Sequence, residues 1–279
     1  MVAWPGRKPG RGAAVRYYVL RAALLAAALC VVPVVIAALW LGLGCAAVVS
    51  ALLIALGWII YFHAERAVLT ALRARPVSEV ERPELFRLVR ELARSARLPM
   101  PRLFVSPATQ PNILTVGYGP RSAAVCCTDG LLKLLSPPEL RAVLAHELSH
   151  VSRRDVAVSS WSAGLASLVA VCPLTALLLQ VAAPAGREYD ADMGGALLTG
   201  EPLELASALR KIDSCAADLP PRPRWPLAAA SHLLIACPFP PGRLGGLGRL
   251  GGLLRTHPPT GERVRRLEGL AGVVGIPPS

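Results

Sequence analysis

The sequence has few aromatic residues and no paired cysteine motif, and each absence excludes a class of partner or site. Aromatic residues make up 5% of the 279 residues, and the 30 Lys and Arg outnumber the 18 Asp and Glu. The basic residues are dispersed, with no interleaved aromatics and no known binding motif, which argues against a nucleic-acid partner. The seven cysteines are odd in number and form no CxxC pair, so neither a disulfide framework nor a cysteine zinc site is predicted.

Charged residues are also scarce, at 17% of the chain. Hydrophobic residues reach 53%, and the mean hydropathy is +0.48. This composition is too apolar for an ordinary soluble enzyme. In such a chain the net charge of +12 indicates contact with anionic lipid headgroups. The length fits one catalytic domain plus membrane segments.

Two apolar runs near the N-terminus predict a transmembrane helical hairpin. Residues 19–40 and 45–62 are each long enough to cross about 30 Å of hydrocarbon, and a short uncharged link joins them. Basic residues flank the pair on both outer sides: Arg7, Lys8, Arg11 and Arg16 before it, and Arg66, Arg73 and Arg75 after it. By the positive-inside rule, both ends and everything after residue 64 face the cytoplasm. The first run is too long for a cleaved signal peptide, and a second follows at once.

The rest of the chain, residues 65–279, predicts one domain that is α+β and mainly α. Apolar residues recur at three- and four-residue spacings over 65–98, which predicts an amphipathic helix. Three short strands with a hairpin turn at 117–121 predict a small antiparallel sheet. The strands are expected at 103–105, 113–116 and 122–128. An exposed edge strand of such a sheet can take an extended peptide by strand addition.

Residues 146–150, HELSH, hold two histidines four positions apart, with a carboxylate next to the first. A proline pair and a helix-forming run precede the motif, which places it on a helix. Because positions i and i+4 lie on one face of a helix, His146 and His150 can bind one metal ion. Glu147 lies beside them as a general base. This set predicts zinc-dependent hydrolysis.

A catalytic zinc site needs a third protein ligand, and the acidic segment 187–192 supplies the candidate. Glu188 and Asp192 are four residues apart, on one face of a predicted helix. We predict that Glu188 binds the metal and that Asp192 accepts the far N–H of a ligand histidine. Asp190 is the competing ligand.

A third apolar stretch, residues 156–185, separates the two halves of this predicted site. Because His150 and Glu188 must reach one ion, the stretch cannot cross a membrane once and end on the other side. Thirty residues are too few for two full spans and a turn. We expect a helical hairpin that enters or packs against the bilayer, with a buried core hairpin as the alternative.

The motifs occur in a characteristic order. The apolar hairpin comes first, then Pro111-Asn112 before the strands, HELSH, REYDADMGGA at 187–196 and THPPTGERVRRL at 256–267. Over nearly all of the chain this order resembles the HtpX-type zinc metalloproteases. They are the membrane heat-shock branch of the family that also contains the CAAX prenyl endopeptidases. The resemblance implies a gluzincin-like protease fold.

The resemblance also implies roles for particular residues. One zinc ion per chain is expected, and its implied ligands are His146, His150 and Glu188. Glu147 is then the general base, His257 lies near the catalytic centre, and Asn112 contacts substrate. Asp192 keeps its predicted role behind a ligand histidine.

These observations predict a membrane-anchored zinc endopeptidase with two parts. Residues 1–64 hold a basic N-terminal segment and the transmembrane hairpin, and residues 65–279 form a metalloprotease domain on the cytoplasmic side of the plasma membrane. By resemblance, its substrates are polypeptides, chiefly damaged or unassembled membrane proteins, and it serves the stress response. Two alternatives stay open: a zinc-binding membrane scaffold or regulator that does not cleave, and a protease that processes prenylated proteins.

Overall fold

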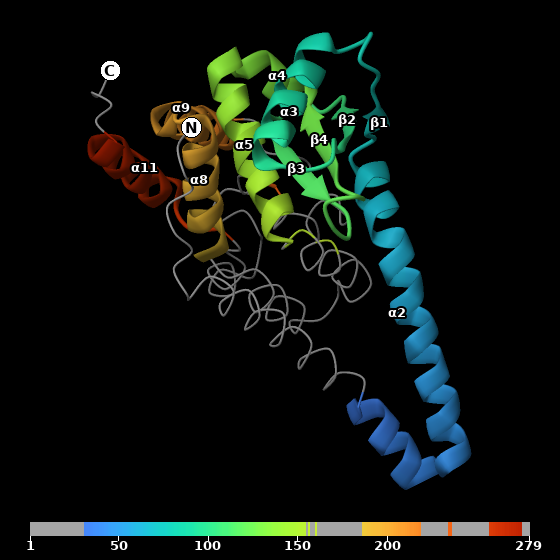
Figure 1. The fold of residues 1–279 in the computed structure, drawn as a ribbon. Coiled ribbons are helices and arrows are strands. Elements are labelled where there is room, and N and C mark those ends of the chain that lie inside the picture. Colours follow the sequence, from blue (N-terminus) through green and yellow to red (C-terminus); the bar gives the residue numbers. More distant parts are fainter. Residues whose placement is uncertain are drawn as a thin grey trace. The chain divides into compact units, whose positions relative to one another are not determined.

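The computed structural model describes residues 31–154, 156, 160, 186–218, 234–235 and 257–274. The chain divides into two compact units, Met1–Phe62 and His63–Ser279. In the first unit the helix Val31–Leu41 is followed by the start of α2 (Leu43–Ala71; Figure 1). Gly42 between them has a φ of +87°, a left-handed conformation that glycine adopts readily. The chain therefore breaks the helix at the predicted link.

Within the described ranges, no single helix is long and apolar enough to cross a membrane. The two parts of α2, Leu43–Ile59 and Phe62–Ala71, meet at a bend of 49°. Taken together, the two parts pass that test, on length and composition alone. The transmembrane hairpin therefore stays a prediction. Most of its first run, and nearly all of the apolar stretch 156–185, lie outside the described residues.

Four strands form a mixed sheet in the second unit, in the order β1-β2-β4-β3. They are β1 (Arg75–Pro76), β2 (Arg102–Ser106), β3 (Ile113–Val116) and β4 (Ala124–Thr128). The predicted hairpin is present, since β3 and β4 pair antiparallel with Val116 opposite Ala124. The expected all-antiparallel sheet is wrong, because β4 lies between β3 and β2 and pairs with β2 in parallel.

Residues 65–98 do not form one helix, contrary to the sequence prediction. α2 ends at Ala71, and Arg73 takes a left-handed φ of 52°. Pro76 then lies in the short edge strand β1, and α3 (Pro83–Ala96) begins at a second proline. A proline cannot continue a helix from its interior, but it fits the first turn. The two prolines therefore divide the segment.

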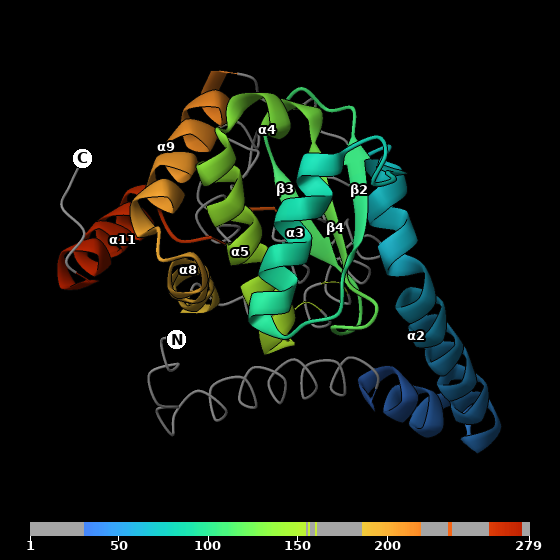
Figure 2. The same ribbon diagram turned by 45° about the horizontal axis from the view of Figure 1, so that its top comes forward.

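Side chains of the sheet alternate between two cores. Ile113, Val125 and Cys127 belong to the main core together with residues of α3 and α5. Leu114, Val116 and Cys126 instead pack with Val68 and Leu69 near the end of α2. Figures 1 and 2 show α3 and α5 side by side over the sheet. The side chains of β3 at odd-numbered positions therefore face α5.

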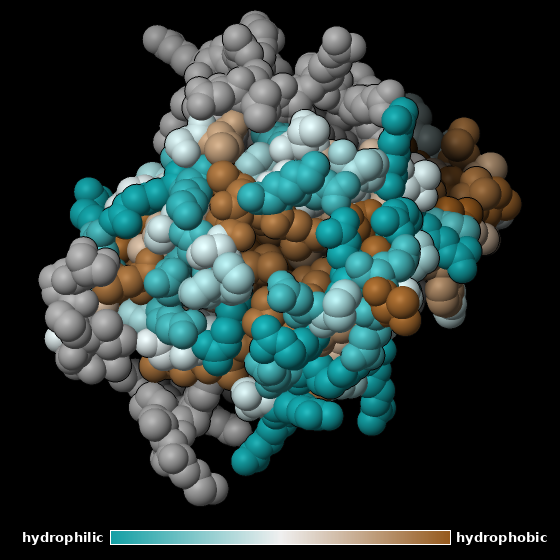
Figure 3. Space-filling view, turned by 90° about the horizontal axis from the view of Figure 1, so that it is seen from above, coloured by the Kyte–Doolittle hydropathy of each residue, from teal (hydrophilic) through white to brown (hydrophobic). Residues whose placement is uncertain are grey.

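The remaining helices surround α5 (Pro137–Arg153) in the second unit. They are α4 (Asp129–Leu134), α8 (Gly186–Thr199), α9 (Pro202–Asp218) and α11 (Thr260–Val274). α5 packs against α3, α8 and α9, and α11 packs against α8 and α9 (Figure 2). The face drawn in Figure 3 carries hydrophilic side chains around a group of hydrophobic ones. Because α3, α8 and α9 all pack against α5, the helix with the HELSH motif lies at the centre of its unit.

Candidate active site

The start of α5 is fixed by a buried carboxylate. The backbone N–H and the hydroxyl of Ser136 both donate to Glu139 Oε2 at 2.9 Å. Ser207 donates to the other oxygen at 2.6 Å, and Lys211 lies within 2.8 Å of it. Burial raises the pKa of Glu139, but the bonds from Lys211, Ser207 and Ser136 outweigh it and lower the pKa to about 2. This network ties α5 to α9 and fixes the register of the motif helix.

The HELSH residues lie on a part of α5 that is buried all round, from Ala142 to Val151. His146 is 1% exposed, and the His150 ring lies edge-on to it, with ring centroids 4.9 Å apart. Glu147 is 3% exposed. The predicted spacing therefore brings two imidazoles to one side of the helix, with a buried carboxylate beside them.

Close contact between α5 and α8 depends on glycine at the crossing point. A side chain at Gly195 would place its Cβ 2.8 Å from the backbone nitrogen of His146. One at Gly194 would lie 2.1 Å from the Ser149 hydroxyl oxygen. Because backbone atoms cannot move aside as a side chain can, Gly195 sets the distance between the two helices.

We expect Gly195→Ala to push α8 away from α5. Its destabilisation should be about 1–3 kcal/mol, the usual cost of overpacking, and metal affinity should fall because Glu188 moves with α8. Gly269→Ala in α11 is the matched control, since nothing lies within 4 Å of its added Cβ. Thermal unfolding and a chelator competition assay measure the two effects. Equal behaviour of the two variants would contradict this role for Gly195.

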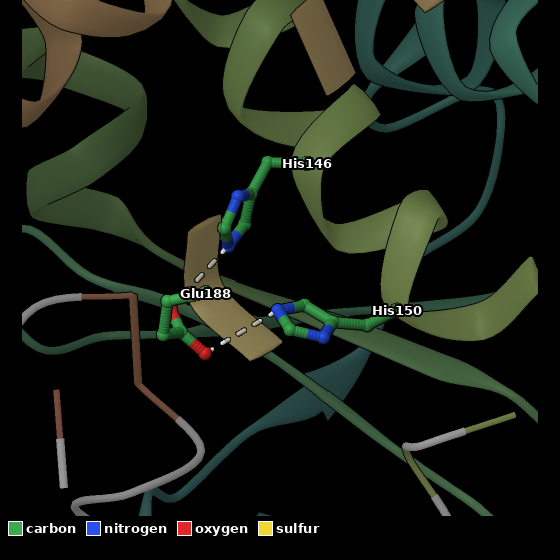
Figure 4. A group of neighbouring side chains, drawn as sticks. All are labelled: His146, His150 and Glu188. Atoms are coloured by element: carbon green, nitrogen blue, oxygen red, sulfur yellow. Dashed lines mark ion pairs between the residues drawn. The ribbon is translucent and has the colours of Figure 1, made fainter. Parts of the chain in front are cut away.

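The first turn of α8 brings Glu188 to the two histidines. Its Oε2 lies 3.8 Å from Nε2 of His146, and its Oε1 lies 3.6 Å from Nε2 of His150. In Figure 4 the carboxylate projects from α8 toward both rings of α5. One ligand atom from each of the three residues lies within 4.8 Å of the others. Glu188 thus converges with two histidines that lie 38 and 42 positions before it in the chain.

The three side chains fit a zinc ion. Ligand atoms that share a tetrahedral zinc at about 2.1 Å lie roughly 3.4 Å apart, close to the spacing here. Nε2 of His146 is fully buried and has no hydrogen-bond partner among the described residues. A buried polar atom of this kind is costly unless something binds it. The donor set, two imidazoles and a carboxylate, is one that catalytic zinc uses.

Asp192 lies behind the first histidine. Its Oδ1 is 2.9 Å from Nδ1 of His146, so the imidazole presents Nε2 to the Glu188 side. Asp190 points elsewhere and accepts a bond of 2.8 Å from Arg153. It is not part of the His146, His150 and Glu188 group. The geometry therefore favours Glu188 over Asp190 as the third ligand.

Arg263 is a site residue that the sequence reasoning missed. It is 2% exposed and donates two bonds to Asp192, from Nε at 2.8 Å and from Nη2 at 2.7 Å. Its Nη1 donates to the Ile235 carbonyl at 2.8 Å and lies 3.6 Å from Glu188 Oε2. One available signal was its place in the THPPTGERVRRL segment. A second signal was the acidic pair itself, because Glu188 and Asp192 need a cation nearby if both are buried.

The charges around Glu188 keep it ionised. Burial raises its pKa, but His257, His150 and Arg263 together hold the pKa well below the usual range of a glutamate. Nδ1 of His257 lies 3.4 Å from Glu188 Oε2. For Asp192, burial is likewise outweighed by Arg263 and His146, and its pKa falls to about 2. Both carboxylates are therefore anionic at neutral pH, as a metal site requires.

A pocket opens onto this group. Its lining residues are Thr115, His146, Glu147, His150, Val156, Arg187, Glu188, Leu234, Ile235 and His257. The general-base candidate and His257 thus share one pocket with the three ligand candidates. Asn112 does not line it. The side-chain oxygen of Asn112 accepts from the Ile113 N–H at 3.0 Å, and the backbone N–H of Asn112 donates to the Thr128 hydroxyl at 2.8 Å. Asn112 therefore holds the start of β3.

Comparison with known proteins gives the family. Residues 79–271 match the model of peptidase family M48. This chain belongs to peptidase family M48. The M48 match spans strands β2, β3 and β4, the His146, His150 and Glu188 group, and Arg263.

Curated relatives of this M48 peptidase carry the name Protease HtpX homolog. The one from Kineococcus radiotolerans is 44% identical over 245 residues, which cover 76% of this chain and 81% of the relative. The one from Paenarthrobacter aurescens is 42% identical over 239 residues, with the same coverage. The one from Bifidobacterium longum is 37% identical over 244 residues, which cover 76% of this chain and 78% of the relative. The predicted enzyme class, an HtpX-type metalloendopeptidase, is confirmed, and neither alternative gains support.

Proposed function

We propose that this M48 peptidase is a membrane-anchored, zinc-dependent endopeptidase of membrane-protein quality control. The observation that carries the proposal is the convergence of His146, His150 and Glu188 in one pocket, with Glu147 next to them. Three ligands of this type leave a coordination position open, which is the pattern of catalytic rather than structural zinc sites.

The chain's own residues prepare the metal site. Asp192 holds Nδ1 of His146, and Arg263 holds Asp192, so Nε2 of His146 is presented as a ligand atom. His150 and Glu188 complete the set from the facing turns of α5 and α8. Zinc bound there supplies Lewis-acid chemistry, which polarises a carbonyl and lets water lose a proton near neutral pH.

Glu147 and His257 act on the reacting atoms in this proposal. The Glu147 carboxylate takes a proton from the attacking water and later gives it to the leaving amine. His257 lines the same pocket, with its Nδ1 3.4 Å from Glu188 Oε2. From there its imidazole stabilises the negative charge that develops on the substrate's carbonyl oxygen.

Substrate is proposed to bind as an extended strand along β3, the edge of the sheet next to the pocket. Part of this edge is already paired. Leu114 forms an antiparallel bridge with Leu234, and the Ile235 N–H donates to the Ile113 carbonyl at 3.1 Å. A polypeptide therefore adds beside or in place of residues 234–235. Contact between substrate and Asn112 remains part of the proposal.

Membrane anchoring is supported by exposed apolar side chains in the first unit. Trp40, Leu43, Leu52, Ile54 and Trp58 are each at least 60% exposed to solvent. Such surface fits lipid better than water. We propose that residues 1–64 hold a basic N-terminal segment and a hairpin in the plasma membrane. Residues 65–279 then lie on the cytoplasmic side, with the apolar stretch 156–185 entering or packing against the bilayer. A protease anchored in this way meets damaged membrane proteins first, so we propose these as its substrates. Stress damages more membrane proteins and therefore increases the demand for their cleavage.

Metal analysis tests the proposal directly. The full-length protein, purified in detergent, should contain one zinc per chain and cleave fluorescein-labelled casein. A chelator should abolish cleavage, and added zinc should restore it. His150→Ala should lose zinc, whereas His63→Ala, at an exposed histidine on α2, should retain it. Zinc-free wild-type protein that zinc cannot activate would contradict the proposed function.

A further inference from the structure

Thr115 makes a contact inside the pocket that the functions assigned so far do not use. Its hydroxyl donates to Oε2 of Glu147 at 2.6 Å, and both side chains are buried, at 4% and 3% exposure. Among the described residues, Thr115 is the one hydrogen-bond partner of the Glu147 carboxylate. The two residues are 32 positions apart and come from different elements, β3 and α5.

The backbone aims Thr115 at Glu147. Ile113 of β3 lies in the core shared with α5, whereas Leu114 and Val116 lie in the core on the other side of the sheet. Thr115 therefore shares the α5 side with Ile113, because strand side chains alternate between faces. β4 holds it in place, with Thr115 opposite Val125 in the ladder. A β-branched side chain on such a strand has few rotamers, so its hydroxyl is a fixed donor.

A glutamate carboxylate needs such a fixed partner. Its terminal torsion is broad and nearly two-fold, so an unrestrained carboxylate spreads over many orientations. A hydrogen bond to a charged group is stronger than one between neutral groups, and it is enough to select one of these orientations. With Oε2 bound to Thr115, Oε1 is the oxygen left to face the attacking water.

We propose that Thr115 is a positioning residue for catalysis, which orients the general base Glu147 by a hydrogen bond to its Oε2. The inference rests on the proposed function, because it takes Glu147 as the base. Thr115 itself touches neither the metal ligands nor the reacting atoms in this role. Its loss should therefore impair turnover while leaving substrate binding and metal binding in place.

The test compares Thr115→Val and Thr115→Ala, which lack the hydroxyl, with Thr115→Ser, which keeps it. With full-length protein and labelled casein, both hydroxyl-free variants should lower kcat about ten-fold or more, with KM and zinc affinity within about two-fold of wild type. Thr115→Ser should recover kcat to within about three-fold. Thr199→Val is the control for losing a threonine hydroxyl elsewhere, since the Thr199 hydroxyl donates to the Gly195 carbonyl and accepts from the Glu201 N–H, and Thr199 does not line the pocket.

The outcomes separate this inference from the proposed function. If Glu147→Gln is inactive but Thr115→Val and Thr115→Ala keep the wild-type kcat, the positioning role is wrong and the proposed function stands. A parallel loss of zinc affinity in these variants, or no rescue by serine, also overturns the role. If Glu147→Gln keeps full activity, the base assignment and the role of Thr115 fail together.

Discussion

Glu147→Gln is expected to lower kcat for peptide-bond cleavage by about 10²–10⁴-fold, the range that general acid–base catalysis contributes. The amide has nearly the shape of the carboxylate, but it cannot take a proton from water. It can still accept the Thr115 hydroxyl bond, so the pocket should keep its structure. Zinc content should remain at one per chain, because the three ligand candidates are unchanged. Casein cleavage and metal analysis on the same preparation measure both.

Glu204→Gln provides the matched control for this prediction. Glu204 lies in the first turn of α9, outside the pocket, and loses the same charge on substitution. Its cleavage rate should equal that of the wild type. Cleavage by Glu147→Gln at the wild-type rate, with zinc bound, would show that another group serves as the base.

Arg263→Met is expected to destabilise the catalytic domain by about 3–5 kcal/mol, because it leaves buried carboxylates without their cation. The guanidinium, at 2% exposure, donates to Asp192 twice and lies 3.6 Å from Glu188 Oε2. Methionine keeps most of the side-chain volume, so the loss reports charge and hydrogen bonding rather than a cavity. Zinc affinity should also fall about 10–100-fold, the usual effect of losing the partner of a ligand.

Two further variants make this prediction specific. Arg263→Lys keeps the charge but not the planar fork that binds Asp192 through two nitrogens, so it should recover only part of the stability. Arg265→Met removes an exposed arginine two residues away and should change stability by less than about 0.5 kcal/mol. Thermal unfolding and chelator competition are the measurements. Equal stability of Arg263→Met and Arg265→Met would contradict the role of Arg263.

Much of the candidate metal site follows from helix geometry. His146 and His150 are four residues apart, and so are Glu188 and Asp192, and each pair lies on one face of its own helix, as predicted. The sequence was less informative for the segment before the motif helix. There the apolar spacing suggested one helix over 65–98, but Pro76 and Pro83 outweigh the spacing, because a proline removes a backbone donor and clashes within a helix.

Strand pairing shows where sequence reasoning failed. The hairpin of β3 and β4 was predictable because its two strands are joined by a short turn. The parallel pairing of β2 with β4 was not, since Leu103 opposite Val125 is a contact between strands separated by another strand in the sequence. Short apolar strands of this kind pair equally well in several orders when only their residues are known, and packing against α3 and α5 selects one.

The sequence by itself determined the chemistry: two histidines, a neighbouring glutamate and a later acidic pair, at spacings that a helix turns into a ligand set. These features are local, because the hydrogen bonds of a helix fix the relation of residues three and four apart. Tertiary structure decided which distant groups meet them. Arg263 reaches Asp192 across 71 positions, and Thr115 reaches Glu147 across 32. Those contacts depend on how helices and sheet pack, as at Gly195, where the absence of a side chain lets α8 approach His146.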